Sequence, residues 1–106
     1  MSSQENESRL VYEIMQTVGK LGAVYRTNAG RIRLPNGATF HGLPKGFADI
    51  MAIFPGPRIA FIECKIKGNT PTPEQAAFLE RMRGMGCMAG VAFSVDDALQ
   101  ICGFTK

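Results

Sequence analysis

Apolar residues recur at three- and four-residue spacing in two long stretches, and this pattern predicts two amphipathic helices. The first helix begins after Ser2, which forms a capping box with Glu5. The second begins after Thr72, with Gln75 as its capping partner. A short third helix is predicted over 95–101. The long helices would bury their apolar stripes, which are Leu10, Val11, Ile14, Met15, Val18 and Leu21 in the first and Phe78, Leu79, Met82 and Met85 in the second.

Shorter apolar runs bounded by glycine and proline predict strands. Pro55-Gly56-Pro57 is the only connection between two of these runs, and Pro35-Asn36-Gly37 separates two others, so each pair is predicted to form an antiparallel hairpin. Asn28-Ala29-Gly30 is predicted to be a turn before the earlier hairpin. The predicted strands cover residues 23–27, 31–34, 38–41, 50–54, 58–65 and 88–93.

The strand over 58–65 ends on two charges. Side chains alternate along a strand, so Glu63 and Lys65 continue an otherwise apolar face. This placement is costly unless the charges pair or bind a metal. Taken alone, the two residues could be an ordinary ion pair on a strand, but antiparallel pairing with 50–54 would bring Asp49 toward both of them. The hairpin therefore predicts two carboxylates and a lysine at one place on the sheet.

Length and composition indicate one soluble domain over residues 1–106. No apolar run approaches the about 20 residues of a membrane span, and the N-terminus lacks a signal-peptide pattern, so we expect a cytoplasmic protein that does not associate with a membrane. The cysteines at 64, 87 and 102 have no paired spacing, which favours buried thiols over a zinc site or disulfides.

The net charge of +3 is unevenly distributed. Between positions 20 and 67 there are eight basic residues and only two acids, Asp49 and Glu63, whereas the remaining segments hold four basic residues and seven acids. A basic middle segment suits a polyanion such as nucleic acid, although scattered solvated charges are the alternative for any single arginine. The residues that we expect to contact a nucleic-acid backbone are Arg26, Arg31, Arg33 and Lys45.

Two further polar residues fall on the apolar faces of the predicted helices. Projecting the first stripe backwards places Glu7 on the buried side, where it is either a functional acid or a partner of the helix dipole. The same projection places Gln75 toward the sheet.

The loop over 41–46 delivers Lys45 and backbone N–H groups ahead of Asp49, either as a phosphate-binding loop or as a plain turn. His41 lacks a recognisable catalytic partner.

The order helix, three strands, helix, strand, with these residues on it, resembles the PD-(D/E)XK nuclease superfamily and, within it, the stand-alone VRR-NUC domains of phage and bacteria. Ala48 stands where the superfamily name has proline, a proline that is commonly missing. The matching residues are Glu7, Y-R-T-N-A-G over 25–30, P-K-G-F-A-D-I over 44–50, I-E-C-K over 62–65, T-P-E-Q over 72–75 and G-V-A-F-S over 90–94.

The resemblance implies a restriction-endonuclease-like αβββαβ core of the α/β class, with a mixed central sheet flanked by helices and a β-hairpin insertion. It implies that Asp49, Glu63 and the backbone carbonyl of Cys64 hold Mg²⁺ or Mn²⁺, which prefer oxygen ligands. Glu7 would complete a second metal position or orient a ligated water. Lys65 would stabilise the attacking water and the developing charge, and Gln75 would position a phosphate or support the site.

The implied reaction is hydrolysis of DNA phosphodiester bonds, with selectivity for branched DNA of the Holliday-junction-resolving kind. Cutting two strands of a junction needs two centres related by a two-fold axis, so we expect a homodimer. The alternative is a nucleic-acid-binding subunit of a phage recombination or packaging complex with little activity of its own. Two intact carboxylates argue against a module that only binds nucleic acid, because they would repel DNA unless a cation intervened.

Overall fold

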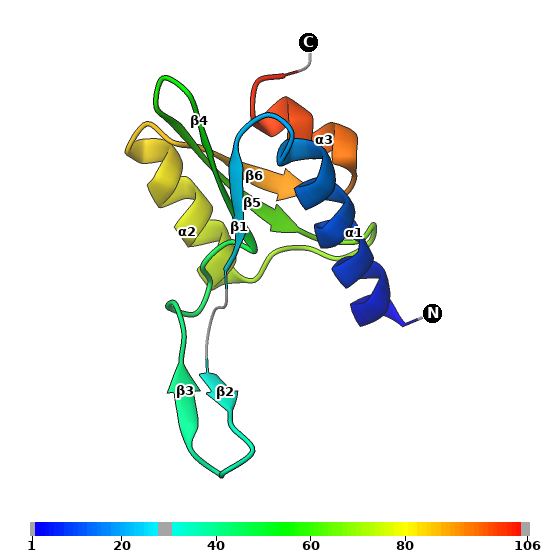
Figure 1. The fold of residues 1–106 in the computed structure, drawn as a ribbon, viewed down its shortest axis with the longest axis vertical. Coiled ribbons are helices and arrows are strands. Elements are labelled where there is room, and N and C mark those ends of the chain that lie inside the picture. Colours follow the sequence, from blue (N-terminus) through cyan, green and yellow to red (C-terminus); the bar gives the residue numbers. More distant parts are fainter. Residues whose placement is uncertain (1, 28–30, 105–106) are drawn as a thin grey trace.

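The structure, a computed structural model, describes residues 2–27 and 31–104. Four strands form one sheet in the order β1-β4-β5-β6, and β2 and β3 form a separate hairpin (Figure 1). The predicted turn over 28–30 lies outside the described residues. The elements are α1 (Ser3–Val18), β1 (Ala23–Arg26), β2 (Arg31–Arg33), β3 (Thr39–His41), β4 (Ile50–Phe54), β5 (Arg58–Cys64), α2 (Pro73–Gly84), β6 (Met88–Ala92) and α3 (Val95–Ile101).

The central pair of the sheet is the predicted hairpin of β4 and β5. The connection over 55–57 is so short that Phe54 lies opposite Arg58, and the register then places Ile50 opposite Ile62. Strand β1 pairs antiparallel with the other edge of β4, while β6 runs parallel to β5. A parallel neighbour requires a crossover connection, and α2 provides it. The sheet is therefore mixed, as the resemblance implies.

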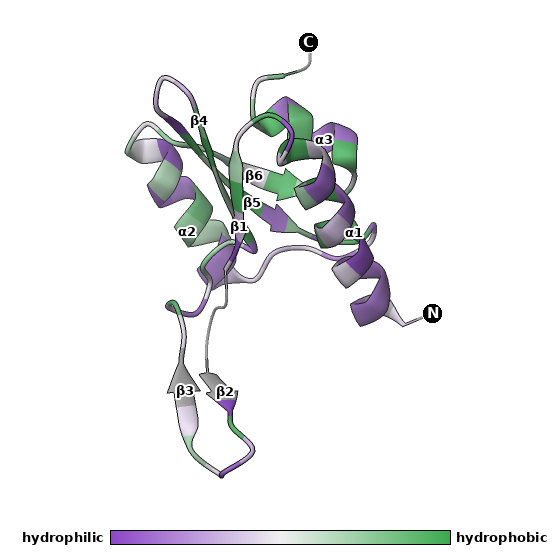
Figure 2. Cartoon of the chain, viewed as in Figure 1, coloured by the Kyte–Doolittle hydropathy of each residue, from purple (hydrophilic) through white to green (hydrophobic). Residues whose placement is uncertain are grey.

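One face of the sheet is covered by α1 and α3, which pack against each other and against the strands (Figure 1). In Figure 2 hydrophobic residues colour much of the four-stranded sheet and alternate with hydrophilic ones along the helices, whereas the first turns of α1 are hydrophilic. The predicted stripe of α1 supplies Val11, Ile14 and Val18, each at most 1% exposed, to this larger core. Alternate β5 residues, Ala60 and Ile62, meet them from the sheet.

The opposite face of the sheet is covered by α2, which packs on β5 and β6. Its smaller core contains the rings of Phe47, Phe61 and Phe78, which lie with centroids 4.5 to 5.7 Å apart. Phe47 comes from the loop that leads into Asp49, so these aromatic contacts attach that loop to the sheet and to α2. The loop that carries the acid is thereby anchored on the α2 face.

The helix starts follow the predicted caps. The Ser2 hydroxyl accepts from the Glu5 N–H, and Thr72 and Gln75 make both bonds of a capping box. The predicted burial is wrong for two residues of the stripes, because Leu21 is 39% exposed and Met85 is 63% exposed. Both lie beyond the last residue of their helix, so the helical spacing no longer sets the direction of their side chains. No helix within the described ranges is long and apolar enough to cross a membrane.

The β2–β3 hairpin protrudes from the end of the body that carries the start of α2 (Figure 1). Within the described residues, neither strand contacts any other helix or strand. It lengthens the molecule to 46 Å, against 33 and 26 Å along the other axes. A two-stranded hairpin is only marginally stable alone in water, so a partner that packs on it would add to its stability.

Candidate active site

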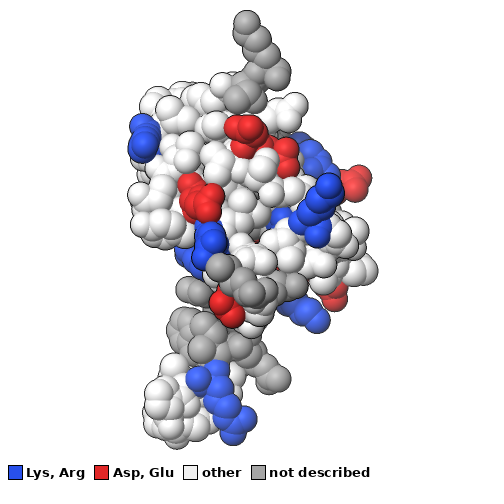
Figure 3. Space-filling model, turned by 90° about the vertical axis from the view of Figure 1, so that its right-hand side faces the viewer, with Lys and Arg blue, Asp and Glu red and all other residues white. Residues whose placement is uncertain are grey.

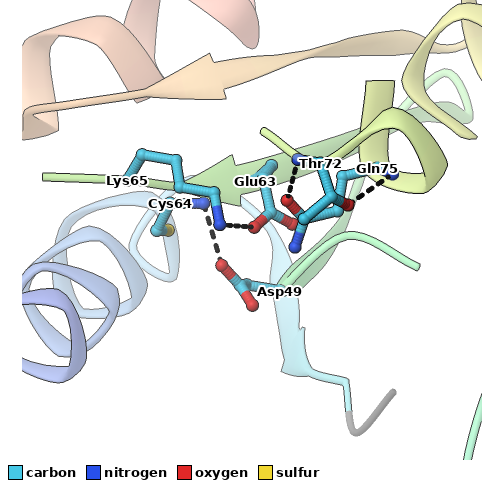
Figure 4. Close-up of polar contacts among 6 residues, drawn as sticks. All are labelled: Asp49, Glu63, Cys64, Lys65, Thr72 and Gln75. Carbon is cyan, nitrogen blue, oxygen red and sulfur yellow. Dashed lines mark hydrogen bonds and ion pairs between the residues drawn. The ribbon is translucent and has the colours of Figure 1, made fainter. Parts of the chain in front are cut away.

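Asp49 lies one residue before β4, and its backbone and side chain serve different strands. Its carbonyl accepts from the Thr27 N–H at 2.9 Å, which continues the β1–β4 ladder by one pair. Its carboxylate turns the other way, and Oδ2 accepts from the Cys64 N–H at 2.9 Å (Figure 4). The side chain therefore takes the place of a backbone acceptor beside β5, which fixes the carboxylate against the end of that strand.

Glu63 is the one buried charged side chain of the described residues, at 1% exposure. Within the described residues, neither of its carboxylate oxygens has a hydrogen-bond partner. Burial, followed by the nearby charge of Asp49, raises the pKa of Glu63 to about 7, although Lys65 acts in the opposite direction. An acid in this state favours either a proton or a cation beside it, because burying an unpaired carboxylate is costly.

Lys65 follows the last residue of β5 and lies next to Glu63, as predicted. Its Nζ is 3.4 Å from Glu63 Oε2, and its side chain is only 13% exposed (Figure 4). The contact is an ion pair that does not reach hydrogen-bond geometry. Its backbone N–H donates to the Ala92 carbonyl of β6 at 3.0 Å, which fixes the start of the side chain. The ammonium thus has donors available for a further acceptor.

Glu7 lies half-buried near the start of α1, as projected from the stripe. Its charge contributes, after burial and the charges of Asp49 and Glu63, to raising the pKa of the Cys64 thiol. Glu7 lies on α1, which covers the face of the sheet that carries Cys64, whereas Glu63, one position earlier on β5, faces α2. The structure does not bring the three carboxylates into one cluster: no group of three His, Cys, Asp or Glu side chains within the described ranges could hold an ion.

Gln75 points from the start of α2 toward the Glu63 carboxylate (Figure 4). Its Oε1 accepts from the Thr72 N–H at 2.9 Å, and its own N–H donates to Thr72 Oγ1 at 3.2 Å. The cap thus fixes the side chain and uses its acceptor, so only the amide nitrogen can still donate to a ligand. Gln75 lies toward the sheet, as the helical spacing predicts, and the capping bond to Thr72 holds its side chain there.

The basic residues predicted to bind DNA occupy different places. Arg26 is exposed and pairs across β1 and β4 with Ile50, the residue after Asp49, and Arg33 is exposed on the hairpin. The strand position of Arg31 is described, but its side chain is not. Lys45 is 79% exposed, with Nζ 3.8 Å from Glu74 Oε2. Figure 3 shows a basic side chain on the hairpin and side chains of both charges on the face formed by α1 and α3.

The basic residues between positions 20 and 67 do not all lie near the acids. Arg58 lies at the opposite end of β5 from Glu63, where its guanidinium stacks 5.5 Å from the ring centroids of both Phe54 and Phe104. Its Nη1 also donates to the Cys102 carbonyl at 3.3 Å. Arg58 therefore attaches the C-terminal segment to the sheet and lies roughly 17 Å from Glu63 along β5.

Thr27 was not predicted as part of the site. It is half-buried, its hydroxyl donates to the Ala48 carbonyl, and its N–H donates to the Asp49 carbonyl. In sequence it is the last residue of a predicted strand and lies in the Y-R-T-N-A-G motif over 25–30, to which no role was assigned. A Thr at that point is compatible with any strand end, so its contact with Asp49 depends on the β1–β4 register, which the sequence pattern does not set.

The donor atoms at the end of β5 suit a hard divalent cation. Asp49 and Glu63 face each other one pair beyond the end of the β4–β5 ladder, and the backbone of Cys64 lies between Glu63 and Lys65. Carboxylate and carbonyl oxygens are the ligands that Mg²⁺ and Mn²⁺ prefer. The unpartnered, buried oxygens of Glu63 are the observation that a cation at this position would satisfy. The residues present therefore fit such an ion.

No family model matches the sequence, and no curated protein matches it. Among solved structures, the chain is similar to one titled VRR_NUC domain, with a TM-score of 0.66 and 22% sequence identity. The match covers 94% of this chain and 97% of that one. The α/β fold that the sequence motifs imply, with a mixed sheet between helices and an inserted hairpin, is thus confirmed. Over nearly its whole length, the chain has the fold of a VRR_NUC domain.

Proposed function

We propose that this protein is a divalent-metal-dependent nuclease that hydrolyses phosphodiester bonds in DNA. One observation carries the proposal: Glu63 is buried beside Asp49, and neither of its carboxylate oxygens is hydrogen-bonded within the described part of the chain. Two carboxylates and a lysine at the end of adjoining strands form an arrangement suited to binding a cation against a phosphate. The likeness of fold to a VRR_NUC domain supports the same assignment.

Asp49, Glu63 and the Cys64 carbonyl would hold Mg²⁺ or Mn²⁺. When bound, the ion would supply Lewis-acid stabilisation of the charge on the scissile phosphate. Lys65, whose ammonium lies 3.4 Å from Glu63, would orient the attacking water and stabilise the negative charge that develops on the phosphate oxygens. Its burial strengthens this effect, because water screens a charge less when the side chain is mostly enclosed. Water would form the new P–O bond while the bond to the leaving sugar oxygen breaks.

Two residues would assist from the surrounding elements. Gln75 has its acceptor engaged in the α2 cap, so its amide nitrogen would donate to a phosphate oxygen. Glu7, half-buried on α1, would complete a second metal position or orient a ligated water. Loss of Gln75 or Glu7 should reduce activity less than loss of Asp49 or Glu63, because neither residue belongs to the pair of facing carboxylates.

DNA would approach from the end of the sheet that carries the acids, where the hairpin also begins. Arg26 would contact the DNA backbone from β1, where it pairs with Ile50, and Arg31, Arg33 and Lys45 would contact it from the hairpin and the following loop. Each neutralised phosphate releases counterions, so binding should weaken steeply as salt rises. Removing Arg31 and Arg33 together should lower both affinity and salt slope; an unchanged slope would show that the hairpin does not face DNA.

The finer proposal is a homodimer that cuts branched DNA of the Holliday-junction type. A domain with one centre presents little surface to a junction, whereas two-fold symmetry supplies two centres. The protruding hairpin, which contacts no other element within the described residues, is a candidate for the contact between subunits. Light scattering at micromolar concentration tests the assembly: a monomeric mass that persists with DNA bound, with only nicked product, would rule the dimer out.

A cleavage assay over linear, nicked, flapped and four-way DNA, with Mg²⁺ or Mn²⁺ or with chelator, tests the activity. Asp49→Asn, Glu63→Gln and Lys65→Ala should each abolish cutting while circular dichroism remains native. The exposed acid Glu80 provides a matched control for Glu63, because Glu80→Gln makes the same chemical change on the solvent side of α2. Full cutting by a folded variant of the first set contradicts the assignment. Binding without cutting by the wild-type chain would favour a nucleic-acid-binding subunit instead.

A further inference from the structure

We infer that Thr27 is a positioning residue for Asp49, and the inference rests on the metal-binding role proposed for that acid. Thr27 bonds the peptide groups on both sides of Asp49: its hydroxyl donates to the Ala48 carbonyl and its N–H donates to the Asp49 carbonyl. The backbone of the acid is thus fixed before and after its Cα atom. The direction of the carboxylate follows from that backbone.

The strand register shows what Thr27 changes. Ile50 pairs with Ile62 across β4 and β5, so the next hydrogen-bonded position on β4 would set Ala48 opposite Cys64. In a continued ladder the Cys64 N–H would donate to the Ala48 carbonyl. Instead it donates to Asp49 Oδ2 at 2.9 Å. The regular ladder stops one pair early, and the carboxylate occupies the place of a carbonyl.

This exchange leaves the Ala48 carbonyl in need of another donor. Ala48 is completely buried, so water cannot supply one without entering the core. A buried carbonyl without a partner carries a desolvation penalty, and nearly all such groups in folded proteins are bonded. The Thr27 hydroxyl is the donor that the structure provides. By bonding the Ala48 carbonyl, the hydroxyl offsets the desolvation penalty that the bond between Cys64 and Asp49 would otherwise cause.

Removing the hydroxyl should return the Ala48 carbonyl to the Cys64 N–H and displace the carboxylate from the end of β5. Thr27→Val has nearly the same shape and keeps the backbone bond to Asp49, whereas Thr27→Ser keeps the hydroxyl. Thr17→Val makes the same chemical change at a half-buried position on α1, away from the acids. Ile14→Val is a core change that controls for lost stability.

The first readout is the Cys64 amide resonance of the metal-free chain in ¹H–¹⁵N spectra, with Asp49→Asn as the reference. Thr27→Val should move the resonance in the same direction as Asp49→Asn, while Thr27→Ser and Thr17→Val should leave it in place. The measurement requires neither metal nor DNA. An unmoved Cys64 resonance in Thr27→Val, or an equal displacement in Thr27→Ser, would overturn the positioning role.

The second readout is Mn²⁺ binding by calorimetry without DNA. Loss of one hydrogen bond should raise the dissociation constant of Thr27→Val by about threefold to tenfold. Thr27→Ser should restore wild-type affinity, and Ile14→Val should keep it. Equal losses in Thr27→Val and Ile14→Val would overturn the inference, because general destabilisation would then explain both. If the wild-type chain neither binds Mn²⁺ nor cuts DNA while the Cys64 resonance still moves, the proposed function fails and the positioning of Asp49 stands.

Discussion

The raised pKa of Glu63 predicts that the metal-free protein becomes less stable as pH rises through neutrality. The folded state raises this pKa from 4.5 to about 7, mainly through burial and then through the charge of Asp49. The folded chain therefore binds the Glu63 proton more tightly than the unfolded chain does. Its contribution to stability is fully present below the unfolded pKa and is lost as pH rises through the folded value.

The difference between the two pKa values corresponds to about 3 kcal/mol of unfolding free energy between pH 5 and pH 8. Glu63→Gln keeps the shape and cannot ionise, so it isolates this contribution. In chelator, we expect wild type and Glu63→Gln to have similar stability near pH 5, and wild type to be about 3 kcal/mol less stable near pH 8. In a Lys65→Met background, the stability difference near pH 8 between the chain with Glu63 and the chain with Glu63→Gln should be larger, because Lys65 lowers the pKa of Glu63.

Urea unfolding followed by circular dichroism at several pH values, with reductant to protect the free cysteines, measures these differences. Adding Mn²⁺ at pH 8 should stabilise the wild type, by about 2.7 kcal/mol at a concentration one hundred times the dissociation constant. It should have little effect on Glu63→Gln. Parallel stability curves for the two chains across this pH range would refute the reasoning, because Glu63 would then titrate alike in folded and unfolded states.

Two other predictions concern the loop before the site and the acid on α1. Gly46→Ala should lower the unfolding free energy by about 2 kcal/mol in urea denaturation, since Gly46 has φ of +93° and an added Cβ would lie 2.8 Å from the Glu74 backbone. Gly37→Ala, with φ of +89° and open space around it, is the control and should cost less. Glu7→Gln should weaken Mn²⁺ binding in calorimetry less than Asp49→Asn does, and an unchanged affinity would leave Glu7 a structural residue.

The meeting of Asp49 with Glu63 was predictable because the chain between them is short and regular. A connection of three residues sets Phe54 opposite Arg58, and counting back along both strands then sets Asp49 opposite Glu63. Helix starts were predictable for a similar reason, since a cap bonds residues only three positions apart. Local geometry fixed each of these contacts.

Features that depend on distant parts of the chain could not be predicted in this way. The spacing of apolar residues does not show where the surface facing a helix ends, so Leu21 and Met85 were placed in stripes that stop before them. Charge counted along the sequence ignores strand direction, and Arg58 and Lys65 are separated by roughly 20 Å along one strand. The hydroxyl of Thr27 became informative only when β1 was found beside β4.

Glu63 lowers the stability of the metal-free fold near pH 8, and this loss indicates why an acid occupies the position. Glu63 lies on the interior strand β5, on the face that it shares with Phe61 and that α2 covers, and its side chain is only 1% exposed. A neutral side chain of the same shape would remove the unpaired charge and stabilise the metal-free fold near pH 8. Packing alone therefore gives no advantage to an acid at this position. If replacing Glu63 raises the stability of the metal-free fold and abolishes cation binding, the residue serves cation binding and not packing.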